Sequence, residues 1–447
     1  MLSVPVASDH PGSLGAELTV VAGRQVVLVE IADERRRGAL SEADGHTFAE
    51  AGEHALGAGL PLLVAISSSG ADANDGVAAL HGWGSAARVI TRCSGRVPVL
   101  MAATGPVVSG PALLLGLADH VVMTEDAYAF VSGPRMVATF TGEMLDSAEL
   151  GGAGVHAVET GLAALVVTDR EAAVEALGHL LAYLPSSTDE EPPRWPTDDP
   201  IDRLTPEAGA AVPDSPTGGY DVRDVVRSIV DDADILELRA RWAPNIVTAF
   251  ATIGGRPVGI VANQPASIAG TLDIPASQKG ARFVAFCDAF GIPLVTLVDT
   301  PGFYPGKDLE WRGMIRHGAQ LAFAYARATV PRVAVVLRKA YGGAYIVMDC
   351  RTMGNDLYLA WPSAEIAVMG ARGAAEILHR RETAERRMEL EEEYDERFLN
   401  PYVAADRGAV DAVIDPADTR REVAAALEVL SSKQERLVQR KHDNQPL

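Results

Sequence analysis

Two short turns contain the residues of this sequence that are best suited to chemistry. One has the sequence Gly342-Gly343-Ala344 and follows the apolar run 333–337, and the other, Ser109-Gly110, follows the run PVLMAATG. Glycine after a buried strand is typical of a tight turn, or of a backbone that another group must approach closely. Free N–H groups at such a turn, where a helix begins, can stabilise negative charge on a carbonyl oxygen. The two turns therefore predict a reaction in which negative charge develops on two carbonyl oxygens.

No side-chain motif of a common catalytic class accompanies these turns. The sequence contains no HExxH, no GxSxG and no His or Cys spacing typical of a metal site, so no metal is expected. The segment GFYPGKD at 302–308 is one residue shorter than a phosphate-binding loop and has Asp308 where that loop needs Ser or Thr. His379 could act as a base, but beside two arginines it is more simply an exposed residue of a charged helix. Main-chain groups therefore remain the candidates.

An internal repeat relates the two turns. Matching segments recur in the same order along the chain, first at an offset of 232 residues and then at offsets of 233 and 237. The pairs are Gly23-Arg24 with Gly255-Arg256, Gly38 with Gly270, Gly70 with Gly302, Val97-Pro98 with Val330-Pro331, Gly110 with Gly343, and Gly133-Pro134-Arg135 with Gly370-Ala371-Arg372. Short loop insertions would cause such a drift in the offset. The chain is therefore predicted to contain two copies of one fold, with Gly110 and Gly343 in equivalent places.

Each copy has the sequence pattern of an α/β fold. Short, continuously apolar segments, PLLVAIS and PVLMAATG in the first copy and PLVTLVD and RVAVVLR in the second, are typical of strands buried on both faces of a sheet. Helices are expected over residues 75–90 and 313–328, and a solvated helix over the charged segment 376–398. A segment rich in Pro, Asp and Glu is expected to form an extended connector. The predicted division is a first domain, this connector and a second domain, at residues 1–184, 185–220 and 221–447.

Composition argues against several classes of partner. The 447-residue chain is 48% hydrophobic, which is enough for a large core, and its net charge of -21 argues against nucleic acid or an anionic membrane. The N-terminus has no signal-peptide pattern, and the uncharged segment 97–118 contains prolines and glycines that indicate strand, turn and helix rather than a membrane span. Three widely spaced cysteines predict no disulfide, which fits a cytoplasmic protein. They are Cys93, Cys287 and Cys350.

Longer motifs in the second copy resemble those of a known family. They are VGIVANQPASIAGTLDIPASQKGARFVAFCDAFGIPLVTLVDTPGFYPG at 258–306, RKAYGGAYIVMDC at 338–350, LAWPSAEIAVMGARGAAEILHRRE at 359–382 and NPYVAADRGAVDAVIDP at 400–416. With them the chain resembles, over almost its whole length, the carboxyltransferase (beta) subunit of biotin-dependent acyl-CoA carboxylases of the propionyl-CoA and acetyl-CoA carboxylase type. The resemblance implies two crotonase-like (ClpP/crotonase) domains and a homo-hexamer. It also implies an active site where the first domain of one protomer meets the second domain of another.

The resemblance further implies the cofactor, the partners and the site residues. A biotinylated carboxylase (carrier) subunit would deliver carboxybiotin, and the carboxyl group would pass to the α carbon of an acyl-CoA or acyl carrier protein thioester. In the family mechanism the biotin nitrogen takes the α proton after CO2 is released, so the protein need only stabilise two oxyanions and exclude water. By position, Ser109 and Gly110 would hold the thioester oxygen, and Gly343 and Ala344 would hold the biotin ureido oxygen. The implied substrate-binding residues are Ser69, Gly70, Ala71, Gly342, Tyr345 and Ile346.

Departures from the family pattern fall mainly on the acyl side. Much of the family's N-terminal segment is missing, its SGGAR stretch is SSGAD at 68–72 with Asp72 for Arg, and its AGGA turn is VSGP at 108–111. Pro111 is tolerated at the first helical position, whereas Ser109 is strained by about 1–2 kcal/mol if its φ is positive. Ile346 stands where propionyl-type enzymes usually have Asp. An isoleucine there predicts an apolar acyl tail, unless the side chain merely packs.

Three functions remain open from the sequence. The first is a carboxyltransferase for an apolar or unusual acyl thioester. The second is a crotonase-type decarboxylase of a malonyl-type thioester, which needs no biotin. The third is a non-catalytic assembly subunit of a carboxylase that has lost its acyl site. Acyl-dependent transfer from carboxylated biotin separates the first function from the other two.

Overall fold

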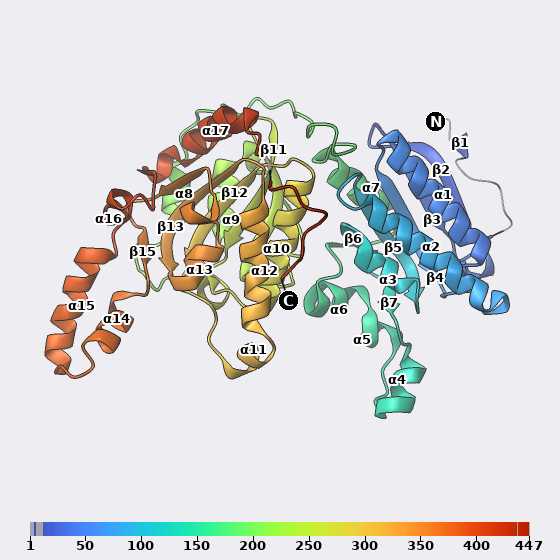
Figure 1. Ribbon diagram of the computed structural model, residues 1–447, viewed down its shortest axis with the longest axis horizontal. Helices are drawn as coiled ribbons and strands as arrows, with labels where there is room; N and C mark the ends of the chain where they lie inside the picture. The colour runs from blue at the N-terminus through green and yellow to red at the C-terminus, as the bar shows by residue number, and fades with distance from the viewer. Residues whose placement is uncertain (1–3, 6–11, 436, 447) are drawn as a thin grey trace. The chain divides into compact units, whose positions relative to one another are not determined.

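The computed structural model describes residues 4–5, 12–435 and 437–446 and separates the chain into two compact units. Unit 1 comprises Met1–Pro193 and Arg239–Trp242, and unit 2 comprises Arg194–Leu238 and Ala243–Leu447. Each unit contains a mostly parallel sheet with helices packed against it (Figure 1). The predicted α/β class is therefore confirmed.

The sheet of unit 1 has the strand order β1-β2-β3-β4-β5-β6-β8, with β7 paired to the end of β5. The β2–β3 pair is antiparallel, and the ladders from β3 onward are parallel. The strands are β1 (Val4–Pro5), β2 (Leu14–Val21), β3 (Arg24–Ile31), β4 (Leu62–Ser68), β5 (Val99–Val108), β6 (His120–Thr124), β7 (Tyr128–Phe130) and β8 (Leu165–Val167). The α-helices are α1 (Glu42–Ala58), α2 (Val77–Cys93), α3 (Ala112–Leu117), α4 (Pro134–Thr141), α5 (Ser147–Gly151), α6 (Ala153–Val155) and α7 (Arg170–Ala182).

The core of unit 1 lies between this sheet and helices α1 and α2. Phe48 of α1 and Val89 of α2 pack in one buried cluster with the strands, while α7 contacts β5 and β6. Every residue of β4 is buried, as its unbroken apolar sequence predicts. A reciprocal cap between Ser41 and Asp44 begins α1, and Gly59, with φ +64°, ends it.

The sheet of unit 2 has the order β16-β14-β13-β12-β11-β10-β9, with β15 paired to the end of β13. Its strands are β9 (Leu236–Glu237), β10 (Ile246–Ile253), β11 (Arg256–Asn263), β12 (Leu294–Thr300), β13 (Arg332–Tyr341), β14 (Leu357–Ala360), β15 (Glu365–Ala367) and β16 (Ala412–Val413). Its α-helices are α8 (Pro206–Ala210), α9 (Val222–Ile229), α10 (Ile274–Ala289), α11 (Lys307–Trp311), α12 (Met314–Arg327), α13 (Gly342–Val347), α14 (Ala371–Leu378), α15 (Ala384–Phe398), α16 (Pro401–Asp406) and α17 (Thr419–Val429). Helices α9 and α17 share a buried cluster with the strands, and α10 contacts β10 and β11.

The two units repeat each other down to strand register. The β4–β5 ladder shifts between Ile66 and Ser68, and the β12–β13 ladder shifts between Val298 and Thr300, each 232 residues later. Residues with positive φ also recur at this offset: Gly23 and Gly255, Arg37 and Ala269, Gly38 and Gly270, Gly59 and Gly291, and Gly70 and Gly302. The predicted duplication is therefore confirmed, with Gly110 and Gly343 each two residues beyond the equivalent strands β5 and β13.

The segment 185–220 differs from the extended connector that its composition predicted. From residue 194 onward it belongs to unit 2, and it contains helix α8. The guanidinium of Arg203 donates to both carboxylate oxygens of Asp199, at 2.6 and 2.9 Å, and also to the carbonyl oxygen of Ser228 at 3.0 Å. The hydrogen bonds from Arg203 lower the pKa of Asp199. This segment is therefore fixed to α9 rather than free.

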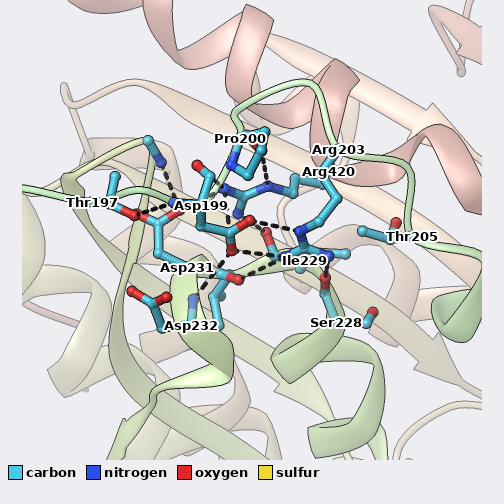
Figure 2. A network of polar contacts seen from close by, with 12 residues as sticks. Thr197, Asp199, Pro200, Arg203, Thr205, Ser228, Ile229, Asp231, Asp232 and Arg420 are labelled. Atoms are coloured by element: carbon cyan, nitrogen blue, oxygen red, sulfur yellow. Dashed lines mark hydrogen bonds and ion pairs between the residues drawn. The ribbon is translucent and has the colours of Figure 1, made fainter.

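A buried arginine of α17 completes this attachment. Arg420 is 0% exposed and donates to Asp231 at 2.6 Å, to the carbonyl oxygen of Ile229 at 2.9 Å and to that of Pro200 at 3.1 Å (Figure 2). The Asp231 carboxylate also accepts the N–H group of Gly255 at 2.8 Å. One side chain thus joins the connector segment, α9 and the β10–β11 turn of unit 2.

Most of the helices predicted from the sequence are present in the structure. The segments 75–90 and 313–328 form α2 and α12, and 97–118 forms strand, turn and helix as predicted. The charged segment 376–398 is not one helix, because α14 ends at Leu378 and the hydroxyl of Thr383 caps a new helix, α15, in which no residue is buried. Among the residues that the structure describes, none of the helices has both the length and the apolar character needed to span a bilayer.

Candidate active site

In unit 2 the candidate turn joins β13 to α13, which begins at Gly342. Gly342 has a φ of +58°, and a Cβ atom there would lie 3.1 Å from the carbonyl oxygen of Val368. Glycine is favoured at this position, because the left-handed region strains any side chain and the space is tight. The reversal of the chain at Gly342 places Gly343 and Ala344 in the first turn of α13.

Gly343 and Ala344 provide main-chain donors at this turn. The N–H groups in the first turn of a helix have no acceptor within that helix. Gly343 is exposed, whereas the side chain of Ala344 is buried. A Cβ atom on Gly343 would lie 3.4 Å from Cε2 of Phe303, an ordinary contact distance. Packing alone therefore does not require glycine at 343, and the exposed backbone can receive an oxygen atom of a ligand.

The equivalent turn of unit 1 joins β5 to α3 and has Ser109 in place of Gly342. Ser109 adopts a φ of +65°, which costs a residue with a side chain about 1–2 kcal/mol. Its N–H group donates to the carbonyl oxygen of Phe130 at 2.9 Å. Pro111 has no N–H group, and its φ of -56° and ψ of -24° are helical, so it does not disturb the turn.

The Phe130 hydrogen bond corrects the expectation for Ser109. The sequence predicted main-chain donors at both Ser109 and Gly110, but the strand pairing of β5 with β7 engages the first of them. Within the described ranges, Gly110 N–H has no acceptor in the protein. The acyl-side turn therefore offers one open main-chain donor, Gly110, where the turn of unit 2 offers two.

Gly110 is held closely by an aromatic ring. A Cβ atom on Gly110 would lie 2.9 Å from Nε1 and Cε2 of Trp83 in α2, which is closer than real side chains approach. In the part of the chain that the structure describes, Trp83 Nε1 is buried and has no hydrogen-bond partner. Glycine at 110 is therefore required by space, whereas at 109 the chain tolerates serine at the expense of backbone strain.

Gly70 and Gly302 lie beside the turns, at equivalent places after β4 and β12. Their φ values are +111° and +140°. The carbonyl oxygen of Gly70 accepts the N–H of Leu40 at 2.9 Å, and that of Gly302 accepts the N–H of Leu272 at 3.1 Å. A Cβ atom on Gly70 would lie 3.4 Å from Cβ of Ser109. The structure therefore brings the predicted substrate-binding glycine of unit 1 next to its candidate turn.

Asp72, which stands where the family has arginine, has a structural role in this loop. Its carboxylate accepts the N–H of Asn74 at 3.0 Å and a guanidinium hydrogen of Arg36 at 2.8 Å. The hydrogen bond from Asn74, followed by those from its side chain and Arg36, lowers the pKa of Asp72. Ser69 donates its N–H to the carbonyl oxygen of Arg37 at 2.9 Å, and Ala71 pairs with Leu40.

The two side chains after the unit 2 turn face different surroundings. Tyr345 packs edge-on against Tyr358, with ring centroids 6.0 Å apart, and burial raises the pKa of Tyr345 to about 12. Ile346 is 38% exposed. Tyr345 therefore stays neutral and supports α13, whereas Ile346 presents apolar surface near Gly343.

Neither of the two aromatic residues beside the turns is predicted from the sequence to have a role. Phe303 directly follows Gly302 in the chain, so its place near a turn could have been inferred from the repeat. Trp83 lies in the middle of α2, and no motif marks a single tryptophan in a helix. Over residues 4–5, 12–435 and 437–446, no group of three His, Cys, Asp or Glu side chains could hold a metal ion.

Comparison with known proteins gives extended matches. The carboxyl transferase domain family matches residues 13–445. The propionyl-CoA carboxylase beta chain of Saccharopolyspora erythraea is 44% identical over 429 residues, which covers 92% of this chain and 79% of the relative. The methylmalonyl-CoA carboxyltransferase 12S subunit of Propionibacterium freudenreichii subsp. shermanii is 46% identical over 415 residues, with 92% and 79% covered.

A solved structure agrees with this chain throughout. Transcarboxylase 12S, described as a hexamer assembly with methylmalonyl-coenzyme A and methylmalonic acid bound, has a TM-score of 0.96 and 44% sequence identity. The match covers 97% of this chain and 85% of that one. Two crotonase-like domains, the duplicated strand-to-helix turns and these matches lead to one conclusion. The chain belongs to the carboxyl transferase family and is an enzyme, the carboxyltransferase component of an acyl-CoA carboxylase.

Proposed function

We propose that the protein transfers the carboxyl group of carboxybiotin to the α carbon of an acyl thioester whose acyl group is apolar. One observation carries the proposal: equivalent strands β5 and β13 end in turns that hold open main-chain donors, Gly110 in unit 1 and Gly343 with Ala344 in unit 2. The related propionyl-CoA and methylmalonyl-CoA enzymes support a coenzyme A thioester, and an acyl carrier protein thioester is the other form that the proposal includes.

The protein's part in this reaction is to hold two oxygens as they gain negative charge. Gly343 and Ala344 would donate to the ureido oxygen of biotin, and Gly110 to the thioester oxygen. Bound carboxybiotin would supply the carboxyl group and the nitrogen base. Donors fixed in advance need no reorganisation during the reaction, and the loss of one such donor typically costs about 10²–10³ in rate. Residues assigned to substrate contact are Ser69, Gly70, Ala71, Gly342, Tyr345 and Ile346.

The proposal for an apolar acyl group rests on Ile346, which is partly exposed next to the donors of α13. We expect Ile346→Asp to lower kcat/KM for long acyl chains relative to short ones. A carboxylate that faces an apolar tail loses hydration without gaining a partner, and one methylene in an apolar pocket is worth about 1–3 kcal/mol, or roughly tenfold or more in selectivity.

The measurement is kcat/KM over a series of straight-chain acyl-CoA substrates, for the wild type and for Ile346→Asp. Ile346→Val serves as the matched control, because it keeps the apolar surface and should preserve the order of substrates. An identical order for the wild type and Ile346→Asp would show that Ile346 does not contact the acyl group. The proposed apolar specificity would then be lost, while carboxyl transfer itself would stand.

We also propose a biotinylated carrier subunit as partner and a homo-hexamer as the assembly, by analogy with the solved relative. Large apolar side chains on both units support an assembly, because surface of this kind is typical of protein interfaces. They include Phe140 (81% exposed) and Met144 (85%) in unit 1, and Trp311 (78%) and Ile315 (85%) in unit 2. Analytical ultracentrifugation should give a mass near six times the 47.1 kDa of the chain. A fully active monomer at micromolar concentration would refute the assembly.

A further inference from the structure

A buried ion pair links the two ends of the segment that contains β13, the turn at Gly342 and α13. Arg332 is the first residue of β13, and Asp349 is the second residue after α13. The Arg332 guanidinium donates to Oδ1 of Asp349 at 2.5 Å, and the two side chains are 2% and 0% exposed. The strand runs to Tyr341, the chain reverses at Gly342, and the residues that follow α13 lie against the first residue of the strand. The ion pair therefore joins the start of β13 to the residues directly after α13, and Gly343 and Ala344 lie between these two points of the chain.

Both charged groups have further partners that fix their positions. The Asp349 carboxylate also accepts from Nδ2 of Asn355 at 2.7 Å. Arg332 donates to the carbonyl oxygens of Gly354 and Met353, at 2.5 and 3.2 Å. The short segment after α13 is thus tied to the first residue of β13 by both a carboxylate and carbonyl groups. Charge-assisted hydrogen bonds of this kind hold geometry more firmly than neutral ones.

The pair is not explained by local stability. Asp349 has a φ of +60°, a conformation that strains residues other than glycine, although Asp tolerates it better than most. Burial of two charges also carries a desolvation penalty that their attraction often fails to offset. In the described part of the chain, Nε of Arg332 and Oδ1 of Asn355 are buried without a partner, so the cluster is not fully satisfied. Such a strained, incompletely paired cluster beside a functional turn suggests a role in function.

We propose that the Arg332–Asp349 ion pair is a positioning device for the carboxyltransfer reaction: it fixes α13 against β13, so that the N–H groups of Gly343 and Ala344 point at the biotin oxygen. The inference rests on the proposed function of these two donors. Arg332 and Asp349 are assigned no contact with a substrate, since both side chains are buried. The effect would pass through the orientation of α13, and small misplacements of reacting groups can cost about 10²-fold in rate.

The protonation of Asp349 should make the transfer rate depend on pH, which provides a second test. Burial raises the pKa of Asp349 to about 7, although Arg332 and the hydrogen bond from Asn355 lower it. The charged or titratable groups around it, from α12, β13, β14 and the segments after α13 and α17, are Tyr325, Arg332, Cys350, Asp356 (paired with Lys433) and Tyr358. The ionised carboxylate is the form that closes the segment, so transfer should increase as pH rises through this pKa.

The stability of the folded protein should change with pH in the opposite direction to the transfer rate. The folded-state pKa of Asp349, about 7, lies above the ordinary value of 3.8, so folding takes up a proton between these two pH values. Stability therefore falls as pH rises across this window. In Asp349→Asn this contribution disappears, and its unfolding free energy should depend less on pH than that of the wild type between about pH 4 and 7.

The test compares Asp349→Asn and Arg332→Lys with the wild type in carboxyl transfer from carboxylated biotin to an acyl-CoA. We expect Asp349→Asn to lower kcat by roughly tenfold to 10²-fold, to leave KM for the acyl-CoA unchanged, and to lose the increase in rate through about pH 7. Arg332→Lys keeps a positive charge and should retain more activity than Arg332→Met. Arg420→Met removes an equally buried arginine of unit 2 and should lower the melting temperature without changing kcat per folded enzyme.

The outcomes separate the inference from the proposed function. Equal kcat and equal pH profiles in the wild type and Asp349→Asn would overturn the inference and leave the proposed function intact. Parallel losses in kcat in Asp349→Asn and Arg420→Met would assign the pair a purely structural role, and would also overturn it. A wild-type enzyme without any transfer would overturn the proposed function, and with it the inference. Amide hydrogen exchange over 343–347 should increase in Asp349→Asn and not in Arg420→Met, independently of any activity.

Discussion

Gly343→Pro should reduce carboxyl transfer by about 10²–10³-fold, because it removes one of the two main-chain donors at the start of α13 and leaves the charge on the biotin oxygen less stabilised. The effect should appear in kcat, since the donors matter most when negative charge develops. Stopped assays of carboxyacyl-CoA formation, with a cognate biotinylated subunit and saturating acyl-CoA, measure it directly. Circular dichroism and the melting temperature establish that the variant is folded.

Gly343→Ala is the matched control for this prediction. A Cβ atom at 343 would lie 3.4 Å from the nearest atom of Phe303, an ordinary contact, and φ of Gly343 is not positive. Alanine keeps the N–H group, so most activity should remain. Gly342→Ala would be a poor control, because φ there is +58° and a side chain is strained. If the proline and alanine variants lost activity equally, bulk at this position would be the cause, and the N–H donor would have no role.

Arg420→Met should have the largest effect on stability, a loss of about 3–5 kcal/mol in the free energy of unfolding, because it leaves the buried carboxylate of Asp231 without its cation. Loss of the bonds to Pro200 and Ile229 also weakens the attachment of the connector segment to α9, which Arg203 still holds. Denaturant unfolding followed by circular dichroism measures the change. Unfolding of unit 2 should move to lower denaturant concentration.

Arg421→Met is the control for Arg420→Met. Arg421 is the next residue of α17, and its side chain is 45% exposed and paired with Asp418 at 3.0 Å. An exposed ion pair of this kind contributes about 0–1 kcal/mol. Similar losses of unfolding free energy in the two variants would mean that the buried network stabilises the protein no more than a surface ion pair does. The proposed attachment of the connector segment through Arg420 would then be contradicted.

The repeat made much of the fold and both turns predictable from the sequence. Segments at a constant offset placed Gly70 with Gly302 and Gly110 with Gly343, and the two sheets have the same order and the same register shifts. A positive φ at Ser109 had been considered only as a condition, from the family's AGGA turn, and the structure shows it. Backbone conformation was predictable because glycine pairs mark it directly in the sequence.

Interactions between distant residues were not predictable in this way. The hydrogen bond from Ser109 to Phe130 depends on how β5 pairs with β7, and composition gives no information on that pairing. Arg420 binds Asp231, 189 residues away, and turns a segment with the composition of a loose connector into part of unit 2. Asp349 lay unnoticed within the motif after the turn, because its partner Arg332 precedes the motif and neither residue type alone indicates a site.

We propose that two backbone turns stabilise the oxygens that gain negative charge as a carboxyl group passes from biotin to an acyl thioester. The most direct test incubates the purified enzyme with its carboxylated, biotinylated partner and a medium-chain acyl-CoA, and measures the carboxyacyl-CoA product by mass spectrometry. We predict product that requires both substrates and decreases about 10²–10³-fold in Gly343→Pro. Decarboxylation of a malonyl-type thioester without biotin, or binding of the biotinylated partner with no product from any acyl thioester, would contradict this function of the turns.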